Sequence, residues 1–191
     1  MLIIDVLNTR TRELMAEAWA NDTYHPANLT HLGYDRYHET AARHLADGDF
    51  TSLYAEVAQF PHDCLQTDKR GALPVDWARR LTMTDYLSLW NCARARELLE
   101  QGETHGMIIR IGEAYVPRGT CLELEGLAVP LELVAQGFRA KYHPAPNRDA
   151  FSLPVGPNCH HGIRALTEAE KAAPSSERNI GGALFLDYGV R

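Results

Sequence analysis

The first half of the chain carries apolar side chains at the three-to-four-residue spacing that predicts amphipathic helices. Tyr86, Leu89, Trp90 and Ala93 form the clearest apolar stripe, in the longest of the expected helices. Aspartate and threonine residues supply N-caps, and glycine or proline supplies stops. We expect helices over residues 10–21, 35–46, 51–60, 74–81 and 85–101, with a loop over residues 62–73.

After Gly102 the spacing changes to the alternation that is typical of half-buried strands. The segment Thr167-Glu168-Ala169-Glu170 also matches a capping box, which predicts the start of a helix. We expect strands over residues 107–111, 114–116, 121–125, 138–142, 151–155 and 183–188, short helices over 130–136 and 167–173, and loops over 154–162 and 175–182.

These elements predict an α+β fold, with a helical N-terminal portion followed by a small mixed β-sheet that carries one or two short helices. A length of 191 residues suits a single domain over 1–191. The change of pattern near Gly102 marks two possible subdomains, a helical one over 1–102 and a β-rich one over 103–191.

The composition is that of an ordinary globular protein, with 45% hydrophobic and 23% charged residues. A formal net charge of −6 argues against nucleic acid as a partner, because nucleic-acid binders usually present a basic face. No basic leader follows Met1 and no apolar run is long enough to span a membrane, so we expect a soluble, cytoplasmic protein. A homodimer is possible, although no apolar stripe specifies one.

The densest group of reactive side chains is the segment Asn158-Cys159-His160-His161-Gly162, in a loop rich in glycine and proline. Loops of this kind often present functional groups, and a histidine beside a cysteine can activate its thiol. We therefore take Cys159, His160 and His161 as candidate catalytic residues. Because neighbours in sequence rarely have the required geometry, a base from elsewhere is the alternative. The candidates for such a base are His38, His105 and His143, and Glu168 or Glu170 could lie nearby.

The same cysteine also allows a zinc-site hypothesis, with His62, Cys64, Cys159 and a neighbouring histidine as ligands. The spacing departs from known zinc signatures, so we assign no metal ligand and no cofactor. The alternative for Cys64 is a buried, unreactive side chain.

Tyrosines and histidines gather between Thr23 and His38, which predicts a surface that binds another protein or protein assembly. Two arginines of the longest expected helix could bind an acidic partner. The candidate partner-binding residues are Tyr24, His25, His31, Tyr34, Tyr37, His38, Arg94 and Arg96. A loop covering the core and ordinary solvated charges are the alternatives.

The block from Cys159 to about Arg191 begins Cys159-His160-His161-Gly162-Ile163-Arg164-Ala165 and resembles a block in some phage-encoded proteins of unassigned function. Those proteins usually have a histidine where this chain has Arg164. The resemblance implies an origin in a mobile genetic element and no particular activity.

Three functions follow as hypotheses. The first is a small protein that acts by macromolecular binding, as an inhibitor or accessory factor of a mobile genetic element. The alternative is a hydrolase or transferase that depends on Cys159 and a histidine. A second alternative is a zinc-stabilised module.

Overall fold

The computed structural model describes residues 8–66, 73–112, 123–137, 151–153 and 159–172. Its elements confirm the α+β class, because the helices fill the N-terminal half and the strands follow. In order they are α1 (Thr9–Ala20), α2 (His31–Asp47), α3 (Phe50–Val57), the 3-10 helix η1 (His62–Cys64), α4 (Trp77–Glu100), β1 (His105–Arg110), β2 (Ala128–Pro130), α6 (Leu131–Gln136), β3 (His161–Ala165) and α7 (Glu168–Ala172).

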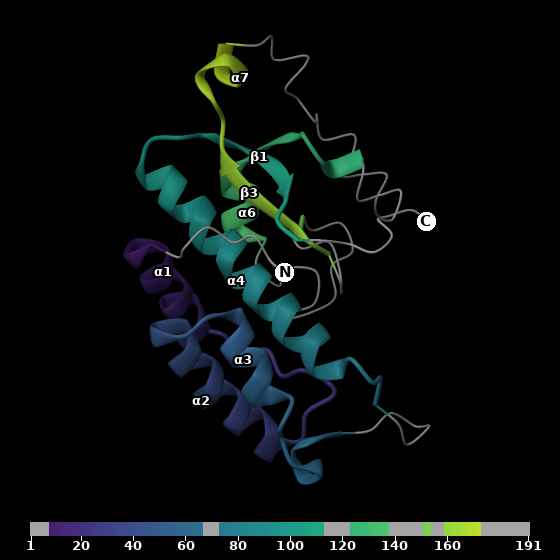
Figure 1. Cartoon of the computed structure of the whole chain (residues 1–191). Coiled ribbons are helices and arrows are strands. Elements are labelled where there is room, and N and C mark those ends of the chain that lie inside the picture. Colours follow the sequence, from purple (N-terminus) through teal and green to yellow (C-terminus); the bar gives the residue numbers. More distant parts are fainter. Residues whose placement is uncertain (1–7, 67–72, 113–122, 138–150, 154–158, 173–191) are drawn as a thin grey trace.

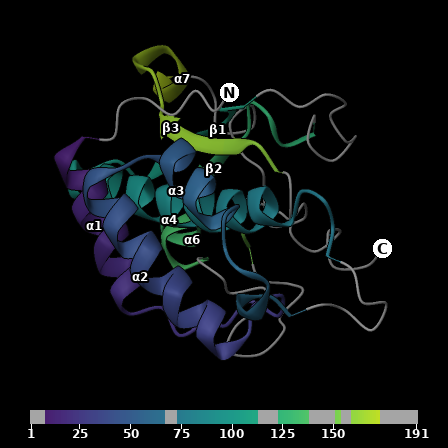
Figure 2. The ribbon, with the colours of Figure 1, turned by 60° about the horizontal axis from the view of Figure 1, so that its bottom comes forward.

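Helix α4 is the central element of the molecule (Figure 1). It runs diagonally through the structure, with α1, α2 and α3 on one side and the sheet on the other. The view from below shows the same division, with β1 and β3 across α4 from α1 and α2 (Figure 2). Helices α1, α3 and α6 and strand β3 all pack against α4.

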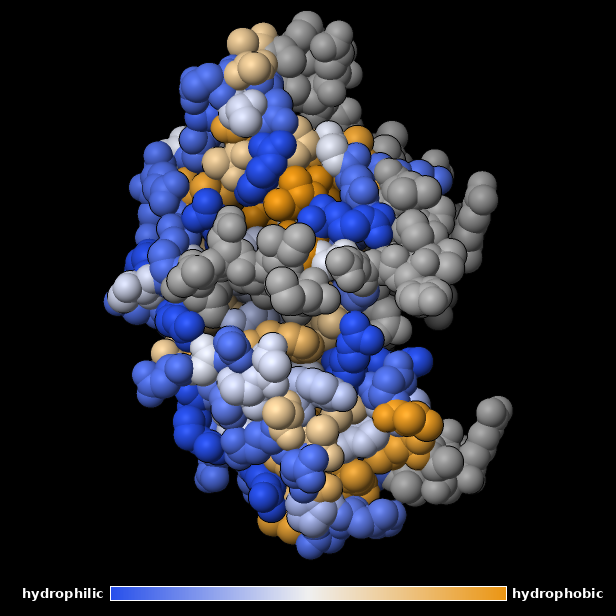
Figure 3. Space-filling view, viewed as in Figure 1, coloured by the Kyte–Doolittle hydropathy of each residue, from blue (hydrophilic) through white to orange (hydrophobic). Residues whose placement is uncertain are grey.

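Two buried clusters share α4. The first joins α4 to α1, α2 and α3 and includes Trp19, Tyr37 and Trp90. The second joins the end of α4 to the sheet and α6 and includes Leu98 and Ile163. Hydrophilic side chains cover most of the described face in Figure 3, and hydrophobic ones show mainly over the sheet and near the lower edge.

The described sheet has three antiparallel strands in the order β2-β1-β3. In its register Ile108 lies opposite Ile163, and Arg110 lies opposite His161. The backbone N–H of Ile111 donates to the carbonyl of His160 at 2.8 Å, so the pairing continues past the ends of both strands. This pairing fixes the segment after Cys159 against β1.

Several predicted helix starts shift because other residues provide the caps. Helix α2 begins at His31, since the Thr30 side chain accepts from the N–H of Gly33. Helix α3 begins at Phe50 with Asp49 as its cap, in a capping box with Ser52. The helices expected over residues 74–81 and 85–101 are joined in the one continuous helix α4, because the hydroxyl of Thr84, the expected cap, donates to the carbonyl of Arg80 within it.

In the second half of the chain some of the predicted elements are confirmed and others are wrong. Helix α6 and the strand β1 are confirmed, and the capping box of Thr167 and Glu170 is present before α7. The strand expected over 121–125 is wrong in its described part, since Glu123 and Leu124 are helical and a turn follows. Residues 151–153 form no strand either. The elements expected over 114–116, 138–142, 175–182 and 183–188 lie outside the described residues.

Within the described ranges no helix is both long and apolar enough to cross a membrane.

Candidate active site

The start of β3 brings a thiol and an imidazole together. Alternate residues of an extended chain point to the same side, so Cys159 and His161 face one way and His160 the other. The Sγ atom of Cys159 lies 3.1 Å from Nδ1 of His161. Both side chains are buried, with relative exposures of 6% for Cys159 and 1% for His161.

The second nitrogen of His161 meets a carboxylate from a distant part of the chain. Nε2 of His161 lies 3.1 Å from Oε1 of Glu125. The turn that holds Glu125 is fixed to β1, because the N–H of Gly126 donates to the carbonyl of Ile108 at 2.9 Å. Gly126 has a φ of 80°, a left-handed conformation that favours glycine.

Arg110 completes the group from the neighbouring strand. Its Nη2 atom forms an ion pair with Oε1 of Glu125, the same oxygen that meets His161. Because Arg110 lies directly opposite His161 in the sheet register, the two strands hold this arrangement in place. The four groups form a continuous series of thiol, imidazole, carboxylate and guanidinium.

The carboxylate of Glu125 determines which ring nitrogen of His161 carries the hydrogen. As an ion-paired carboxylate, Glu125 only accepts hydrogen bonds, so Nε2 of a neutral His161 carries the hydrogen. Nδ1 then presents a lone pair to the thiol of Cys159. This is the order of nucleophile, base and orienting group that thiol catalysis requires.

Helix α4 supports the strand behind these residues. The Asn91 side chain donates to the carbonyl of His161 at 3.1 Å. At Gly162 an added Cβ atom would lie 2.5 Å from the Trp90 ring, so only glycine lets β3 approach α4 this closely. The position of His161 therefore depends on α4 as well as on the sheet.

His160 lies on the opposite side of the segment and is half-buried. Burial lowers the pKa of His160, and the nearby charges of Arg79 and Arg110 lower it further. A neutral imidazole is therefore favoured. Its Nδ1 atom is buried and has no hydrogen-bond partner among the described residues.

Of the three residues proposed from sequence, the structure brings Cys159 and His161 together and turns His160 away. The alternative bases lie elsewhere: His38 stacks on Trp19, and the His105 ring meets the hydroxyl of Thr104. His143 is outside the described residues. Glu168 pairs with Lys171 and Glu170 with Arg164, so neither joins His161.

Sequence reasoning missed Glu125 and Arg110. The sequence analysis assigned no role to either residue, and Glu125 is 36 residues from His161 along the chain. The only local signal is the glycine that follows Glu125, which predicts a turn. The sequence did not predict the antiparallel pairing of β1 with β3, which brings Arg110 opposite His161.

The proposed zinc ligands do not form one site. His62 and Cys64 lie in η1, which packs against α2, whereas Cys159 lies at the sheet. No group of three or more histidine, cysteine, aspartate or glutamate side chains in the described ranges could hold a metal ion. Cys64 is 1% exposed, in agreement with the alternative of a buried side chain.

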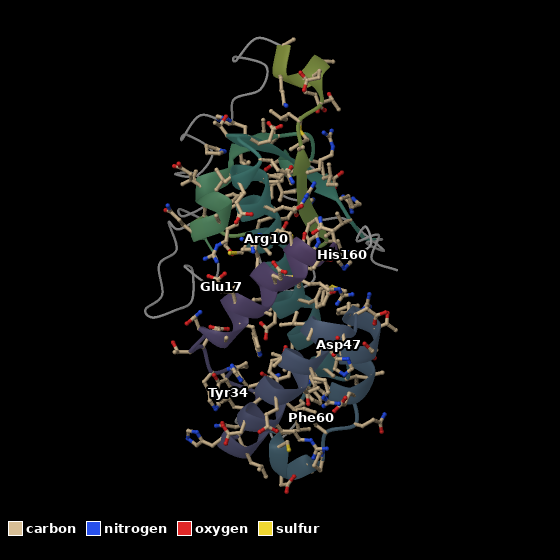
Figure 4. All side chains as sticks on the ribbon, turned by 90° about the vertical axis from the view of Figure 1, so that its left-hand side faces the viewer. Arg10, Glu17, Tyr34, Asp47, Phe60 and His160 are labelled. Carbon is tan, nitrogen blue, oxygen red and sulfur yellow. The ribbon has the colours of Figure 1, made fainter. Side chains whose placement is uncertain are left out.

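The predicted partner-binding residues divide into two groups. A series of rings connects His31, His25, Tyr34, His38 and Trp19, with the closest centroids, those of His25 and Tyr34, 4.6 Å apart. Figure 4 shows Tyr34 well below His160, so this series is separate from the Cys159 site.

The other candidates have different surroundings. Tyr37 is fully buried and donates to Asp85 at 2.9 Å, so it does not belong to the surface. Tyr24 is partly buried. On α4, Arg94 pairs with Glu97 at 2.8 Å and Arg96 lies 3.8 Å from Glu17.

A similar series of groups joins α2 to α3. Ser52 Oγ lies 2.9 Å from Nδ1 of His44, and Nε2 of His44 lies 2.9 Å from Glu56. However, Ser52 Oγ also bonds the backbone of Asp49 as part of the capping box. The carboxylate of Asp49 accepts the N–H of Ser52, so a negative charge lies where an oxyanion would need donors. This second series is a helix-to-helix connection and a useful control.

Comparison of the chain with models of protein families, with curated proteins and with solved structures gave no match.

Proposed function

We propose that the protein is a cysteine-dependent hydrolase or transferase in which Cys159 is the nucleophile, His161 the base and Glu125 the orienting carboxylate. The observation that supports this best is the unbroken series of contacts from Cys159 Sγ through both nitrogens of His161 to Glu125. Burial strengthens each contact, because charges and dipoles interact more strongly where water is excluded.

The chemistry that fits the three groups is acyl transfer. Cys159 Sγ attacks the acyl carbon while its proton passes to Nδ1 of His161, and a C–S bond forms. The bond to the leaving group then breaks, and the leaving group takes the proton from His161. Water, or a second nucleophile in a transferase, gives a proton to His161 and cleaves the thioester, which restores the thiol.

The test is to trap the thioester. The purified chain is mixed with p-nitrophenyl acetate, release of p-nitrophenol is followed, and the acetylated residue is located by mass spectrometry. We expect a burst of p-nitrophenol and a hydroxylamine-sensitive acetyl group on Cys159, both absent in Cys159→Ala and strongly reduced in His161→Gln. Ser52→Ala, which alters the similar series between α2 and α3, is expected to keep the burst. Acetylation spread evenly over lysines, with no burst, contradicts the proposal.

A second candidate function, binding of another protein, is favoured by the series of rings on α2. Leu32, in the first turn of α2, is 56% exposed. Aromatic side chains such as tyrosine are common anchors at interfaces. A partner that co-purifies with the chain should be lost in Leu32→Asp and kept in Val75→Asp, a control at another exposed apolar residue. If both variants keep the partner equally well, this surface does not bind it.

A further inference from the structure

The carboxylate of Glu125 depends on its neighbours for its position. A glutamate side chain has several rotatable bonds, and 29% of this one is exposed. Among the described residues its carboxylate contacts only His161 and Arg110. Because ordering a long side chain costs conformational entropy, a single hydrogen bond to His161 does little to keep the carboxylate from turning toward water. The second contact therefore matters for the geometry of the site.

Arg110 reaches this carboxylate from the strand beside His161. It is the last residue of β1 and lies directly opposite His161 in the register with β3. Figure 1 shows the two strands side by side. Residues that lie opposite each other in an antiparallel pair project their side chains from the same face of the sheet. The guanidinium of Arg110 and the imidazole of His161 thus approach Glu125 from adjacent positions.

The two side chains meet the same atom of Glu125. Nη2 of Arg110 and Nε2 of His161 both contact Oε1. A carboxylate oxygen has about two sites that accept hydrogen bonds, and these two donors use both. The guanidinium keeps its charge and its planar set of donors at any ordinary pH. Arg110 therefore constrains the very oxygen that orients His161.

We propose that Arg110 is a positioning residue that keeps Oε1 of Glu125 in front of Nε2 of His161. The proposal rests on the function proposed above and adds a fourth residue to it. With Arg110 in place the hydrogen stays on Nε2, and Nδ1 keeps its lone pair for the proton of the Cys159 thiol. The bond-making step still belongs to Cys159 and His161.

The first measurement is the rate of iodoacetamide labelling of Cys159 in Arg110→Met, which keeps much of the side-chain length and removes the charge. We expect the rate to fall by at least about threefold, within the usual coupling between residues of one hydrogen-bond network. The matched control is Arg164→Met. Arg164 lies in β3 opposite Met107 and forms an ion pair with Glu170 at 2.7 Å, outside the site. Its replacement should leave the rate unchanged.

The second measurement reads the tautomer of His161 directly. Two-bond proton–nitrogen NMR distinguishes the two ring nitrogens, and comparison with His161→Gln identifies the signals of this ring among the nine histidines. In the wild type and in Arg164→Met we expect one tautomer, with the hydrogen on Nε2. In Arg110→Met the nitrogen shifts should move toward a mixture of both tautomers. A general loss of stability would not produce this change in folded protein.

The third measurement asks whether Arg110 acts through Glu125. In a Glu125→Gln background no carboxylate remains to be positioned, so adding Arg110→Met should not slow labelling further. An equal slowing by Arg110→Met in the wild type and in Glu125→Gln would mean that Arg110 acts by another route, and would overturn the proposal.

The positioning role and the proposed function fail in different ways. If Cys159 reacts faster than Cys64 and Cys92 but Arg110→Met leaves the tautomer of His161 unchanged, the positioning role is overturned and the nucleophile remains. If Cys159 in the wild type reacts no faster than Cys64 and Cys92, the proposed function is overturned, and the role of Arg110 with it.

Discussion

At the scale of single residues, His161 has the most constrained position in the site. Its carbonyl is held by Asn91, one ring nitrogen faces Cys159, and the other faces Glu125. A ring with a contact at each of its two nitrogens cannot turn to exchange them without losing both contacts. In the proposed function Nδ1 is therefore the base and Nε2 the oriented donor.

Replacing Glu125 tests this assignment. In Glu125→Gln the amide no longer requires a hydrogen on Nε2 and no longer balances Arg110, so His161 loses the tautomer that serves the thiol. We expect alkylation of Cys159 to slow by at least about tenfold, at the lower limit of the usual effects of a positioned base. Iodoacetamide labelling followed by peptide mass spectrometry measures it.

The control for Glu125→Gln is Glu123→Gln, an exposed residue two positions earlier. Equal labelling of Cys159 in both variants and in the wild type would show that Glu125 does not orient His161.

At the scale of elements, the approach of β3 to α4 positions the site. Gly162→Ala would place a Cβ atom 2.5 Å from the Trp90 ring and 2.8 Å from Ile111. We expect a loss of about 1–3 kcal/mol in the free energy of unfolding, as in other overpacked cores, measured by urea denaturation. Labelling of Cys159 should slow as well, because β3 must shift.

A smaller side chain at position 90 should reverse part of the destabilisation caused by Gly162→Ala. Trp90→Phe removes ring atoms from the contact, so the double variant should recover part of the stability that Gly162→Ala loses. If the double variant loses as much unfolding free energy as the two single variants together, the Trp90 contact is not what excludes a side chain at residue 162.

The contact between α1 and α4 depends on a buried carboxylate. Glu97 is 6% exposed and accepts from Thr11 Oγ1 at 2.6 Å and from Asn8 Nδ2 at 2.8 Å. Burial alone would raise the pKa of Glu97, but the hydrogen bonds from Thr11, Arg94 and Asn8 outweigh it and lower the pKa.

We expect Glu97→Gln to cost about 1–3 kcal/mol of unfolding free energy, because at least one buried donor loses a charged acceptor. Thermal denaturation measures it as a fall of about 2–4 °C per kcal/mol for a chain of this size. Glu100→Gln, an exposed residue bound to Arg10, is the matched control and should change stability by less than about 0.5 kcal/mol. Similar losses in both variants would contradict a special role for Glu97.

The hydrophobic pattern predicted most of the helices, but it predicted only some of the strands. The apolar stripe of α4 is buried as predicted, but the residues between its members are buried as well, because α4 packs against helices on one side and against β3 and α6 on the other. Strand β3 was not predicted, and its first two residues fall in the loop expected over 154–162, because its histidine, glycine and arginine show no alternation of apolar and polar residues. Its burial comes from α4 and β1, which are remote in sequence, so the Cys159–His161 pair was predicted as a candidate without its geometry.

At the scale of the whole molecule, α4 makes separate subdomains unfavourable. Its first part packs into the cluster with α1, α2 and α3, and its last part, including Leu98, packs into the cluster with the sheet. We expect one cooperative unfolding transition for the chain, with far-ultraviolet circular dichroism and tryptophan fluorescence giving the same midpoint.

A chain ending at residue 102 should fail to fold stably, since the second face of α4 would be exposed. Two separated transitions, or a stable fragment 1–102, would support independent subdomains instead.

Acid should weaken the connection between α2 and α3. Hydrogen bonds from Arg43 and His44 lower the pKa of Glu56 from 4.5 to about 2. Since the folded pKa is below the unfolded one, this stabilisation is present above about pH 4.5 and is lost as the pH falls toward 2. Because the Glu56 side chain is one-third exposed, screening keeps the effect modest. In Glu56→Gln the fall in melting temperature between these pH values should be smaller than in the wild type; an identical fall would contradict the assignment.

The central claim is that His161 activates Cys159, and the most direct test is the rate of iodoacetamide labelling at pH 7. Cys64 and Cys92 serve as internal references, because burial raises the pKa of each thiol and so disfavours the reactive thiolate. The account predicts that Cys159 is labelled at least about tenfold faster than Cys64 and Cys92, and that His161→Gln removes the difference. Labelling of Cys159 as slow as that of Cys92, or as fast in His161→Gln as in the wild type, would contradict it.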